Sequence, residues 1–151
     1  MIFDEVDIQI LEKLKEDCRK SYRTLGEEMN LAPGTISTRV KKMKENGIIK
    51  NFSVIIDYEQ IGYELTSIIE IIVSKGKLIE TEHELAKFHQ VCAVYDATGT
   101  TDIIVVAKSQ NRSELSQLIK TFLSMKYIER TNTHLVLTTV KEDFTNYPAK
   151  I

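Results

Sequence analysis

Apolar residues recur at helical spacing in three short stretches within the first 50 residues of this chain. In the first stretch every fourth position is apolar, at Val6, Ile10, Leu14 and Cys18. The second stretch carries Leu25 and Met29, and the third carries Ile36, Val40 and Met43. Residues spaced by three or four positions share one face of a helix. The pattern therefore predicts three short amphipathic helices over residues 1–50.

A short turn separates the second predicted helix from the third. It contains Asn30, which tolerates the left-handed backbone that ends a helix, and Pro33, which favours the first turn of the next one. Gly26 lacks a side chain and would allow a close approach between the two helices. Two short helices joined in this way are typical of a helix-turn-helix motif, whose second helix enters the major groove of DNA.

The outer face of the third predicted helix is polar and basic, as a DNA-reading helix requires. We expect contacts with base edges from the residues near its start, Thr35, Ser37, Thr38 and Arg39. We expect contacts with phosphates from Tyr22, Arg23, Lys41, Lys42 and Lys44. Many basic helix faces only meet water, so the distribution of charge along the chain also has to be considered.

The chain as a whole is slightly acidic, with 20 Lys and Arg against 22 Asp and Glu and a net charge of -2. Residues 1–17 hold two basic and six acidic side chains, which gives -4, whereas residues 18–50 hold eight basic and three acidic ones, which gives +5. A net positive charge is thus confined to the region that contains the predicted helix pair. This favours contact with DNA phosphates, with an affinity that falls as salt rises.

From residue 65 onward, runs of β-branched and apolar residues alternate with helical patterns. The predicted elements are a strand at 65–73, a helix at 78–89, strands at 91–97 and 102–108, a helix at 113–124 and a strand at 133–141. This βαββαβ order is the split-βαβ plan of ferredoxin-like domains, in which two helices cover one face of an antiparallel sheet.

The expected fold class is therefore α+β, with two domains joined by a linker. We expect a helix-turn-helix domain at 1–50, a linking strand and turn at 51–63, and a ferredoxin-like domain at 64–151. The linking strand is predicted by the β-branched and aromatic residues at 48–56. Because the strand at 65–73 is apolar on both sides, the sheet face opposite the helices also needs a cover. A two-fold homodimer with sheet against sheet would provide it.

Several segments together resemble the Lrp/AsnC (feast/famine) family of transcriptional regulators. The family's first helix is similar to DEVDIQILEKLKEDCR, and its helix-turn-helix and linking strand to LGEEMNLAPGTISTRVKKMKENGIIKNFSVIIDYEQIGY. The hairpin of its effector-binding domain is similar to TGTTDIIVV, and its last strand to RTNTHLVL. The resemblance implies a sequence-specific regulator that binds double-stranded DNA as a homodimer and often as an octamer, a tetramer of dimers.

The resemblance also implies a small effector, usually an amino acid, bound between dimers beside the glycine-containing hairpin. Carried onto this chain, the effector loop consists of Thr98, Gly99, Thr100, Thr101 and Asp102. Thr131 and Thr133 share one face of the last strand and are expected to complete the wall of the site. Asp102 would accept from the ammonium group of an amino acid, while backbone N–H groups and threonine hydroxyls would donate to its carboxylate. Without the resemblance, the same residues fit a plain hairpin turn. The chain departs from the family at His89-Gln90 and at Met125-Lys126-Tyr127, where Pro-containing turns are common.

Two alternative functions share parts of this pattern. An architectural DNA-compacting protein without an effector would carry every one of these motifs. A haem-modifying decarboxylase of the same two-domain plan would need a haem-facing histidine, for which the candidates are His83, His89 and His134. No Ser-His-Asp, phosphate-loop or paired-carboxylate pattern accompanies them, so no catalytic residue is assigned and no enzyme is expected.

The remaining chemistry of the sequence adds few constraints. No Cys/His spacing indicates a metal site, and Cys18 and Cys92 are expected to be small buried hydrophobes rather than disulfide partners. We expect no cofactor apart from the amino-acid effector. A signal-peptide pattern and an apolar run of 18 residues are both lacking, which predicts a cytoplasmic protein without a membrane partner.

Overall fold

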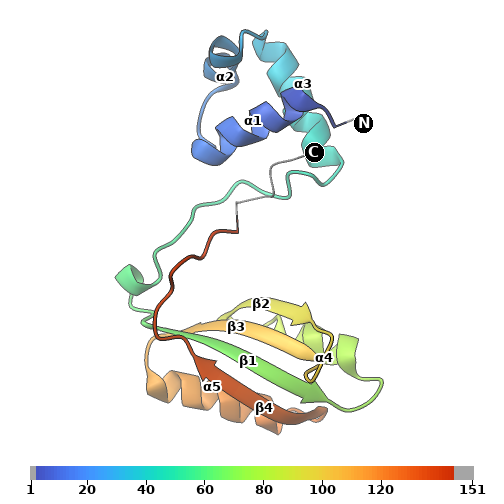
Figure 1. The fold of residues 1–151 in the computed structure, drawn as a ribbon, viewed down its shortest axis with the longest axis vertical. Helices are drawn as coiled ribbons and strands as arrows, with labels where there is room; N and C mark the ends of the chain where they lie inside the picture. Colours follow the sequence, from blue (N-terminus) through green and yellow to red (C-terminus); the bar gives the residue numbers. More distant parts are fainter. Residues whose placement is uncertain (1–2, 145–151) are drawn as a thin grey trace. The chain divides into compact units, whose positions relative to one another are not determined.

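The computed structural model describes residues 3–144 of the chain. Within this range the chain divides into two compact units, one formed by residues 3–55 with 143–144 and the other by Ile56–Glu142. The first unit holds the three N-terminal helices, and the second holds a sheet with its own helices (Figure 1).

The first unit consists of α1 (Glu5–Glu16), α2 (Tyr22–Met29) and α3 (Pro33–Glu45), which confirms the three predicted helices. Asp4 caps α1 by accepting a hydrogen bond from the backbone N–H of Asp7, and the Asp7 carboxylate accepts one from the N–H of Asp4. This reciprocal arrangement satisfies two donors that the helix leaves unpaired. Asn30 ends α2 with φ 55° and ψ 43°, the left-handed conformation predicted for it.

The three helices share one apolar core. Its buried members are Ile10, Leu14, Leu25, Ile36, Val40, Met43 and Ile49. All three buried residues of α3 lie on the face that packs against this core. The opposite face of α3 is therefore left in solvent, as its amphipathic pattern predicts.

The linking strand expected at 48–56 does not form within the described chain. A strand needs a neighbouring backbone for its N–H and C=O groups, and none of the strands in residues 3–144 pairs with this segment. As a result the side chains of Val54 and Ile55 are 77% and 80% exposed. A short 3-10 helix, η1 (Glu59–Ile61), follows this segment.

After η1, the second unit contains four strands and two α-helices in the predicted βαββαβ order. They are β1 (Leu65–Val73), α4 (Leu78–Leu85), β2 (Val91–Asp96), β3 (Ile103–Ser109), α5 (Arg112–Ser124) and β4 (Ile128–Leu135). The strands form one antiparallel sheet in the order β2-β3-β1-β4. Residues of both helices join strand residues in a single core, so α4 and α5 cover the same face of the sheet (Figure 1).

The last strand lies earlier in the sequence than predicted. It runs over Ile128–Leu135, where it pairs with β1, rather than over 133–141. Polar residues at 129–134 occupy much of this edge strand, whereas Leu137 and Val140 in the apolar run that suggested the strand are both almost fully exposed. The prediction was wrong because an edge strand with one solvent-facing side tolerates polar residues that composition alone assigns to a loop. Similarly, α4 ends at Leu85 rather than at residue 89.

The sheet has one face covered by helices and one that is not. Side chains directly opposite one another on paired strands lie on the same face. The register therefore places the following residues on the second face, which we call the open face: Ile68, Glu70, Ile72, Tyr95, Ile104, Val106, Lys108, Arg130, Asn132 and His134. Ile68 and Tyr95 are exposed large hydrophobic residues on this face.

Both cysteines are exposed and free, contrary to the expectation that they would be buried. Cys18 continues the four-residue apolar spacing, but α1 ends at Glu16 and the following Asp17 has an extended backbone. Cys92 lies where the pairing of β2 with β3 shifts register, between Val91 and Ala93. In each case the regular element that would have buried the thiol is interrupted.

Candidate nucleic-acid interface and effector site

The face of α3 opposite the core carries exposed polar and basic side chains. The exposed candidates are Thr35, Thr38, Lys41, Lys42 and Lys44, whereas Ser37 and Arg39 are half-buried. Pro33 is the first residue of the helix, and Ala32 before it provides no side-chain cap. The positive end of the helix dipole therefore has no side-chain acceptor and is open to an anion such as phosphate.

The turn before α3 depends on Gly26. A Cβ atom at this position would lie 2.5 Å from the carbonyl oxygen of Leu31, closer than van der Waals contact permits. The same turn is closed by the N–H of Leu31, which donates to the carbonyl of Gly26 at 2.8 Å. The close approach predicted at Gly26 is present, and its partner is the backbone of the turn.

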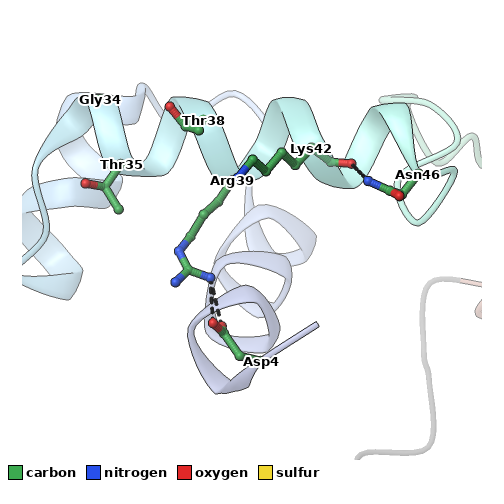
Figure 2. Close-up of a pocket in the computed structure, with 7 residues that line it drawn as sticks. All are labelled: Asp4, Gly34, Thr35, Thr38, Arg39, Lys42 and Asn46. Carbon is green, nitrogen blue, oxygen red and sulfur yellow. Dashed lines mark hydrogen bonds and ion pairs between the residues drawn. The ribbon is translucent and has the colours of Figure 1, made fainter. Parts of the chain in front are cut away.

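Arg39 is directed toward α1 rather than outward (Figure 2). Its Nη1 atom donates to both carboxylate oxygens of Asp4, at 2.8 and 2.9 Å, and to Oδ1 of Asp7 at 2.9 Å. The Asp7 side chain is fully buried, and the Arg39 side chain is 28% exposed. The hydrogen bond from Arg39 lowers the pKa of Asp4 below its usual value. In the free chain the guanidinium is thus occupied by α1, which does not fit the base contact expected of it.

The other basic candidates make only weak contacts on the surface. Lys41 lies 3.8 Å from Glu45, and Arg23 on α2 lies 3.0 Å from Glu27. The ammonium group of Lys44 is 5.7 Å from the centre of the Phe52 ring. Exposed pairs of this kind contribute about 0–1 kcal/mol each, so a phosphate group can compete for these side chains.

The exposed face of α3 borders an open concavity of about 750 Å³ (Figure 2). Its lining residues are Asp4, Gly34, Thr35, Thr38, Arg39, Lys42 and Asn46. Thr35 and Thr38 are one helical turn apart and present hydroxyl groups that can donate or accept hydrogen bonds. The one acid in this set, Asp4, is neutralised by Arg39. The surface is therefore polar and basic, which suits the edges and phosphates of a nucleic acid.

In the second unit, the hairpin between β2 and β3 carries the expected effector residues 98–102. Thr98, Gly99 and Thr100 are exposed, and Gly99 has φ 126°, a conformation that strongly favours glycine. Thr101 and Asp102 are hydrogen-bonded to the end of β1. The Thr101 hydroxyl donates to the carbonyl of Ile71 at 2.9 Å, and Oδ2 of Asp102 accepts from the N–H of Val73 at 2.9 Å. These bonds hold the hairpin against the sheet.

A small pocket opens beside this hairpin on the open face. It has a volume of about 150 Å³, the share of about five water molecules, and is lined by Glu70, Ile72, Thr100, Thr101, Arg130 and Asn132. Thr131 and Thr133, which were expected to complete the site, are paired with Ile71 and Ile69 and therefore face the helix-covered side. The structure thus brings two of the expected threonines together with Arg130, Asn132 and Glu70, which the sequence analysis did not select.

Three polar side chains of the open face are linked beside this pocket. The Asn132 amide donates to Glu70 at 3.0 Å and lies 3.1 Å from Nε2 of His134, and that nitrogen lies 3.5 Å from the Glu70 carboxylate. The hydrogen bond from Asn132, followed by the contact with His134, lowers the pKa of Glu70. The Glu70 carboxylate is therefore held in its charged form, ready to pair with a cation.

In the part of the chain that the structure describes, the histidines and the metal-binding residue types form no larger constellation. His83 is exposed on α4, His89 is exposed and 3.9 Å from Glu114, and His134 has Glu70 beside it. Within residues 3–144 no group of three or more His, Cys, Asp or Glu side chains is placed to hold a metal ion. No helix in that range is both long and apolar enough to cross a bilayer.

Two family models match the chain, one on each unit. Residues 3–50 match a winged helix-turn-helix DNA-binding model, and residues 66–145 match the Lrp/AsnC ligand binding domain. This protein belongs to the Lrp/AsnC family. As a member of the Lrp/AsnC family, it is a DNA-binding transcriptional regulator with a ligand-binding domain, and it is not an enzyme.

Full-length relatives and solved structures agree with this assignment. An uncharacterized HTH-type transcriptional regulator of Pyrococcus horikoshii is 47% identical over 95% of this chain and 97% of the relative. The HTH-type transcriptional regulator FL11 of the same organism is 36% identical over 97% of each chain. Among solved structures, AsnC of Escherichia coli is 28% identical with a TM-score of 0.88 and covers 97% of this chain and 100% of its own. A Neisseria meningitidis transcriptional regulator in complex with L-Met shares the fold, with 24% identity, a TM-score of 0.87 and coverage of 95% of this chain and 96% of its own.

Proposed function

We propose that this Lrp/AsnC regulator reads specific DNA sequences through the exposed face of α3. The observation that carries the proposal is the placement of Thr35, Thr38 and Lys42 around one concavity on the solvent-exposed side of the helix. A helix inserted into the major groove needs hydrogen-bonding groups on its outer face and basic groups at its flanks. Thr35, Ser37 and Thr38 supply the first kind of group.

Phosphate contacts are assigned to the basic and aromatic side chains around that face. These are Tyr22, Arg23, Lys41, Lys42 and Lys44. Arg39 takes a different part, because its guanidinium binds two carboxylates of α1. We assign to it the orientation of α3 on α1, and through that orientation an indirect effect on DNA affinity.

The open face supports assembly as a homodimer with sheet against sheet. Ile68, Ile72, Ile104 and Val106 form an apolar stripe on β1 and β3. Burying such a stripe against a second copy removes apolar surface from water, which favours association. A dimer presents two recognition helices, which suits a site with two half-sites. Assembly of dimers into an octamer would extend the same arrangement along a longer piece of DNA.

The pocket beside the β2–β3 hairpin is proposed as the effector site, with an amino acid as the ligand. Arg130 can donate to a carboxylate, and the charged Glu70 can accept from an ammonium group. Thr100 and Thr101 add hydroxyl groups, and Ile72 adds an apolar wall. The similarity to a Neisseria meningitidis regulator in complex with L-Met supports this class of ligand. Asp102, whose carboxylate accepts from β1, positions the hairpin rather than the ligand.

An effector can change DNA binding only if it binds one assembly state more tightly than another. A ligand held on the open face lies at the surface through which copies would associate. Its affinity would therefore depend on the assembly state, and by linkage it would shift the number and spacing of recognition helices without touching DNA.

The test is selection of duplexes from a random pool by the wild-type protein, followed by titration of the selected site with and without each standard amino acid. We expect one duplex family to be preferred over bulk DNA by at least about 10³ at physiological salt, and one or a few amino acids to change its affinity. Equal binding to selected and random duplexes would contradict sequence-specific regulation and favour the architectural alternative. A selected site whose affinity no amino acid changes would contradict the effector assignment alone.

A further inference from the structure

Lys108 is the most unusual charged residue of the second unit, because its side chain is only 7% exposed. It lies on the open face of β3, directly opposite Thr66 of β1 and diagonal to Ile68, which is exposed. Lysine is almost never fully buried unless its ammonium group is paired. The contacts that bury it therefore indicate what this side chain holds in place.

Three different segments converge on the ammonium group of Lys108. It donates to both carboxylate oxygens of Glu142, at 2.8 and 3.1 Å, and to the hydroxyl of Thr66 on β1 at 3.1 Å. It also lies 5.2 Å from the centre of the Tyr58 ring, within the range of a cation–π interaction. Neither Tyr58 nor Glu142 belongs to the sheet: Tyr58 precedes η1, and Glu142 lies beyond the end of β4.

We propose that Lys108 is a positioning residue that fastens the linking segment at Tyr58 and the C-terminal segment at Glu142 to the sheet. Through Tyr58 it sets the point at which the tether to the DNA-binding unit begins. The proposal rests on the proposed binding of a dimer to two half-sites, because only there does the length of the tether affect affinity. The network Lys108–Tyr58–Glu142–Thr66 is called the clasp below.

The backbone around Tyr58 shows what the clasp would hold. The N–H of Tyr63 donates to the carbonyl of Tyr58 at 2.9 Å, and that of Gly62 donates to Glu59 at 3.0 Å, which closes a compact turn directly before β1. The rings of Tyr58 and Tyr63 pack edge to face at 6.2 Å. The Cys92 thiol beside the phenol of Tyr58 raises the pKa of that phenol, and burial adds to this effect. The turn therefore touches both β2 and β3 through one aromatic side chain.

Release of this turn would lengthen the tether. Ile49 is the last residue before η1 that packs in the helical core, so with Tyr58 held the segment without regular structure spans residues 50–57; with Tyr58 released, it spans residues 50–64, up to the start of β1. The flexible length thus nearly doubles in each copy. The effective concentration of the second recognition helix at its half-site falls as about the −3/2 power of tether length, so doubling lowers it about threefold. Binding to a single half-site does not depend on this term.

The experiment compares the full-length wild type with Lys108→Met, which keeps the length of the side chain, and with Glu142→Gln, which removes one charge. The matched control is Lys77→Met. Lys77 pairs with Glu80 at 2.9 Å and lies 4.6 Å from the Tyr127 ring, but its side chain is 40% exposed and these two partners lie outside the linking segment. Hydrogen exchange followed by mass spectrometry reports on the amides of residues 58–66, and titrations use duplexes with one or two copies of the half-site selected by the wild type.

We expect exchange at 58–66 to become about tenfold faster in Lys108→Met and measurably faster in Glu142→Gln, while the core amides of β1 and β3 keep wild-type protection. The two-copy duplex should lose about threefold in affinity and the one-copy duplex should not change. Lys77→Met should match the wild type in both measurements.

Unchanged exchange at 58–66 in both clasp variants would overturn the proposal, whatever the DNA results. Faster exchange without the selective loss on the two-copy duplex would overturn its link to the tether. If Lys108→Met loosens the whole sheet, Glu142→Gln decides the matter, since local release in that variant supports the clasp and no release refutes it. If the wild-type protein binds none of the duplexes, the proposed DNA-binding function is contradicted, and the exchange data still test the clasp.

Discussion

Nη1 of Arg39 lies 2.9 Å from Oδ1 of Asp7, and the Asp7 side chain is fully buried. The pair joins the middle of α3 to the first turn of α1, and Asp4 adds a second carboxylate to the same nitrogen. A buried carboxylate that loses its partner is left with an uncompensated charge. The orientation of the helix proposed to face DNA thus depends on an ion pair at the edge of the same concavity, which Asp4 and Arg39 also line.

We predict that Arg39→Ala lowers the free energy of unfolding of the first unit by about 3 kcal/mol. This is the lower end of the range for breaking a buried pair, because the guanidinium remains partly exposed. Urea unfolding followed by far-UV circular dichroism measures the change. The control is Arg19→Ala, which removes an exposed pair with Asp17 and should leave the free energy of unfolding close to that of the wild type. If Arg39→Ala keeps its stability and loses only its preference for a specific DNA sequence, the positioning role is contradicted and Arg39 contacts base edges instead.

The same cluster predicts a specific loss of stability in acid. The ordinary pKa of an Asp carboxyl is 3.8, and in the folded state the hydrogen bond from Arg39 holds the pKa of Asp4 below that value. The folded form therefore favours the charged carboxylate. The contribution of Asp4 to the free energy of unfolding is fully present above pH 3.8 and disappears as the pH falls through the lower folded-state pKa. Asp4→Asn keeps a helix cap but cannot titrate. The wild type should exceed Asp4→Asn in unfolding free energy near neutral pH, and the difference should vanish in acid. A difference that stays constant with pH would contradict the assignment.

Replacing Gly26 by alanine should destabilise the helix-turn-helix by about 1–3 kcal/mol, because the added Cβ would meet the Leu31 carbonyl and the turn would have to move. Gly34→Ala is the matched control. Gly34 is helical and has open space at its Cβ position, so alanine there should be neutral or stabilising by up to about 1 kcal/mol. Melting temperatures of the two variants, compared with the wild type, test the prediction. Equal effects would show that the turn is more adaptable than its geometry indicates.

Lys42 and Thr38 should contribute to DNA binding in different ways. Lys42→Ala should weaken binding to selected and random duplexes alike and reduce the slope of log affinity against log salt by about one. Thr38→Ala should leave that slope unchanged and reduce the preference for the selected site by about 1 kcal/mol. Fluorescence anisotropy at several salt concentrations separates the two effects. Lys120→Ala, on the exposed side of α5, is the control for loss of positive charge elsewhere.

The two faces of β4 give a direct test of the effector pocket. Arg130→Ala should abolish the rise in melting temperature that a bound amino acid produces, because it removes the donor to the ligand carboxylate. Thr133→Ala should leave that rise intact, since Thr133 is paired with Ile69 and faces the helix-covered side. A thermal-shift screen with the standard amino acids measures both. If Thr133→Ala abolishes the rise and Arg130→Ala does not, the effector binds on the helix-covered face, as the sequence-based prediction of Thr131 and Thr133 implies.

Several features of the fold follow directly from local sequence patterns. The helices α1, α2 and α3 were predicted from apolar spacing, and Asn30 was recognised as the residue that ends α2. These features depend on neighbours within about four residues, which a linear pattern contains. The exposure of Thr35, Thr38 and Lys42 follows in the same way, because the buried face of α3 defines its opposite.

Other features depend on partners that are distant in the sequence. Arg39 looked like a base-reading residue because nothing near it in the chain shows that Asp4 and Asp7 lie against it, 35 and 32 positions away. The position of β4 was missed because its pairing with β1 stabilises polar residues that have little strand propensity. The predicted linking strand did not form in the single chain, because propensity without a pairing backbone is not enough.

The sequence by itself therefore determined the family, the order of helices and strands, and the side of α3 that faces solvent. Each of these follows from local motifs and from the spacing of apolar residues along the chain. Only the tertiary structure decided that Arg39 pairs with a carboxylate of α1. It also decided that Arg130 and Asn132, rather than Thr131 and Thr133, line the pocket. Finally, it decided that Lys108 contacts both Tyr58 and Glu142. The physical reason is that an ion pair or a pocket wall is fixed by strand register and helix packing, which bring together residues that no local pattern connects.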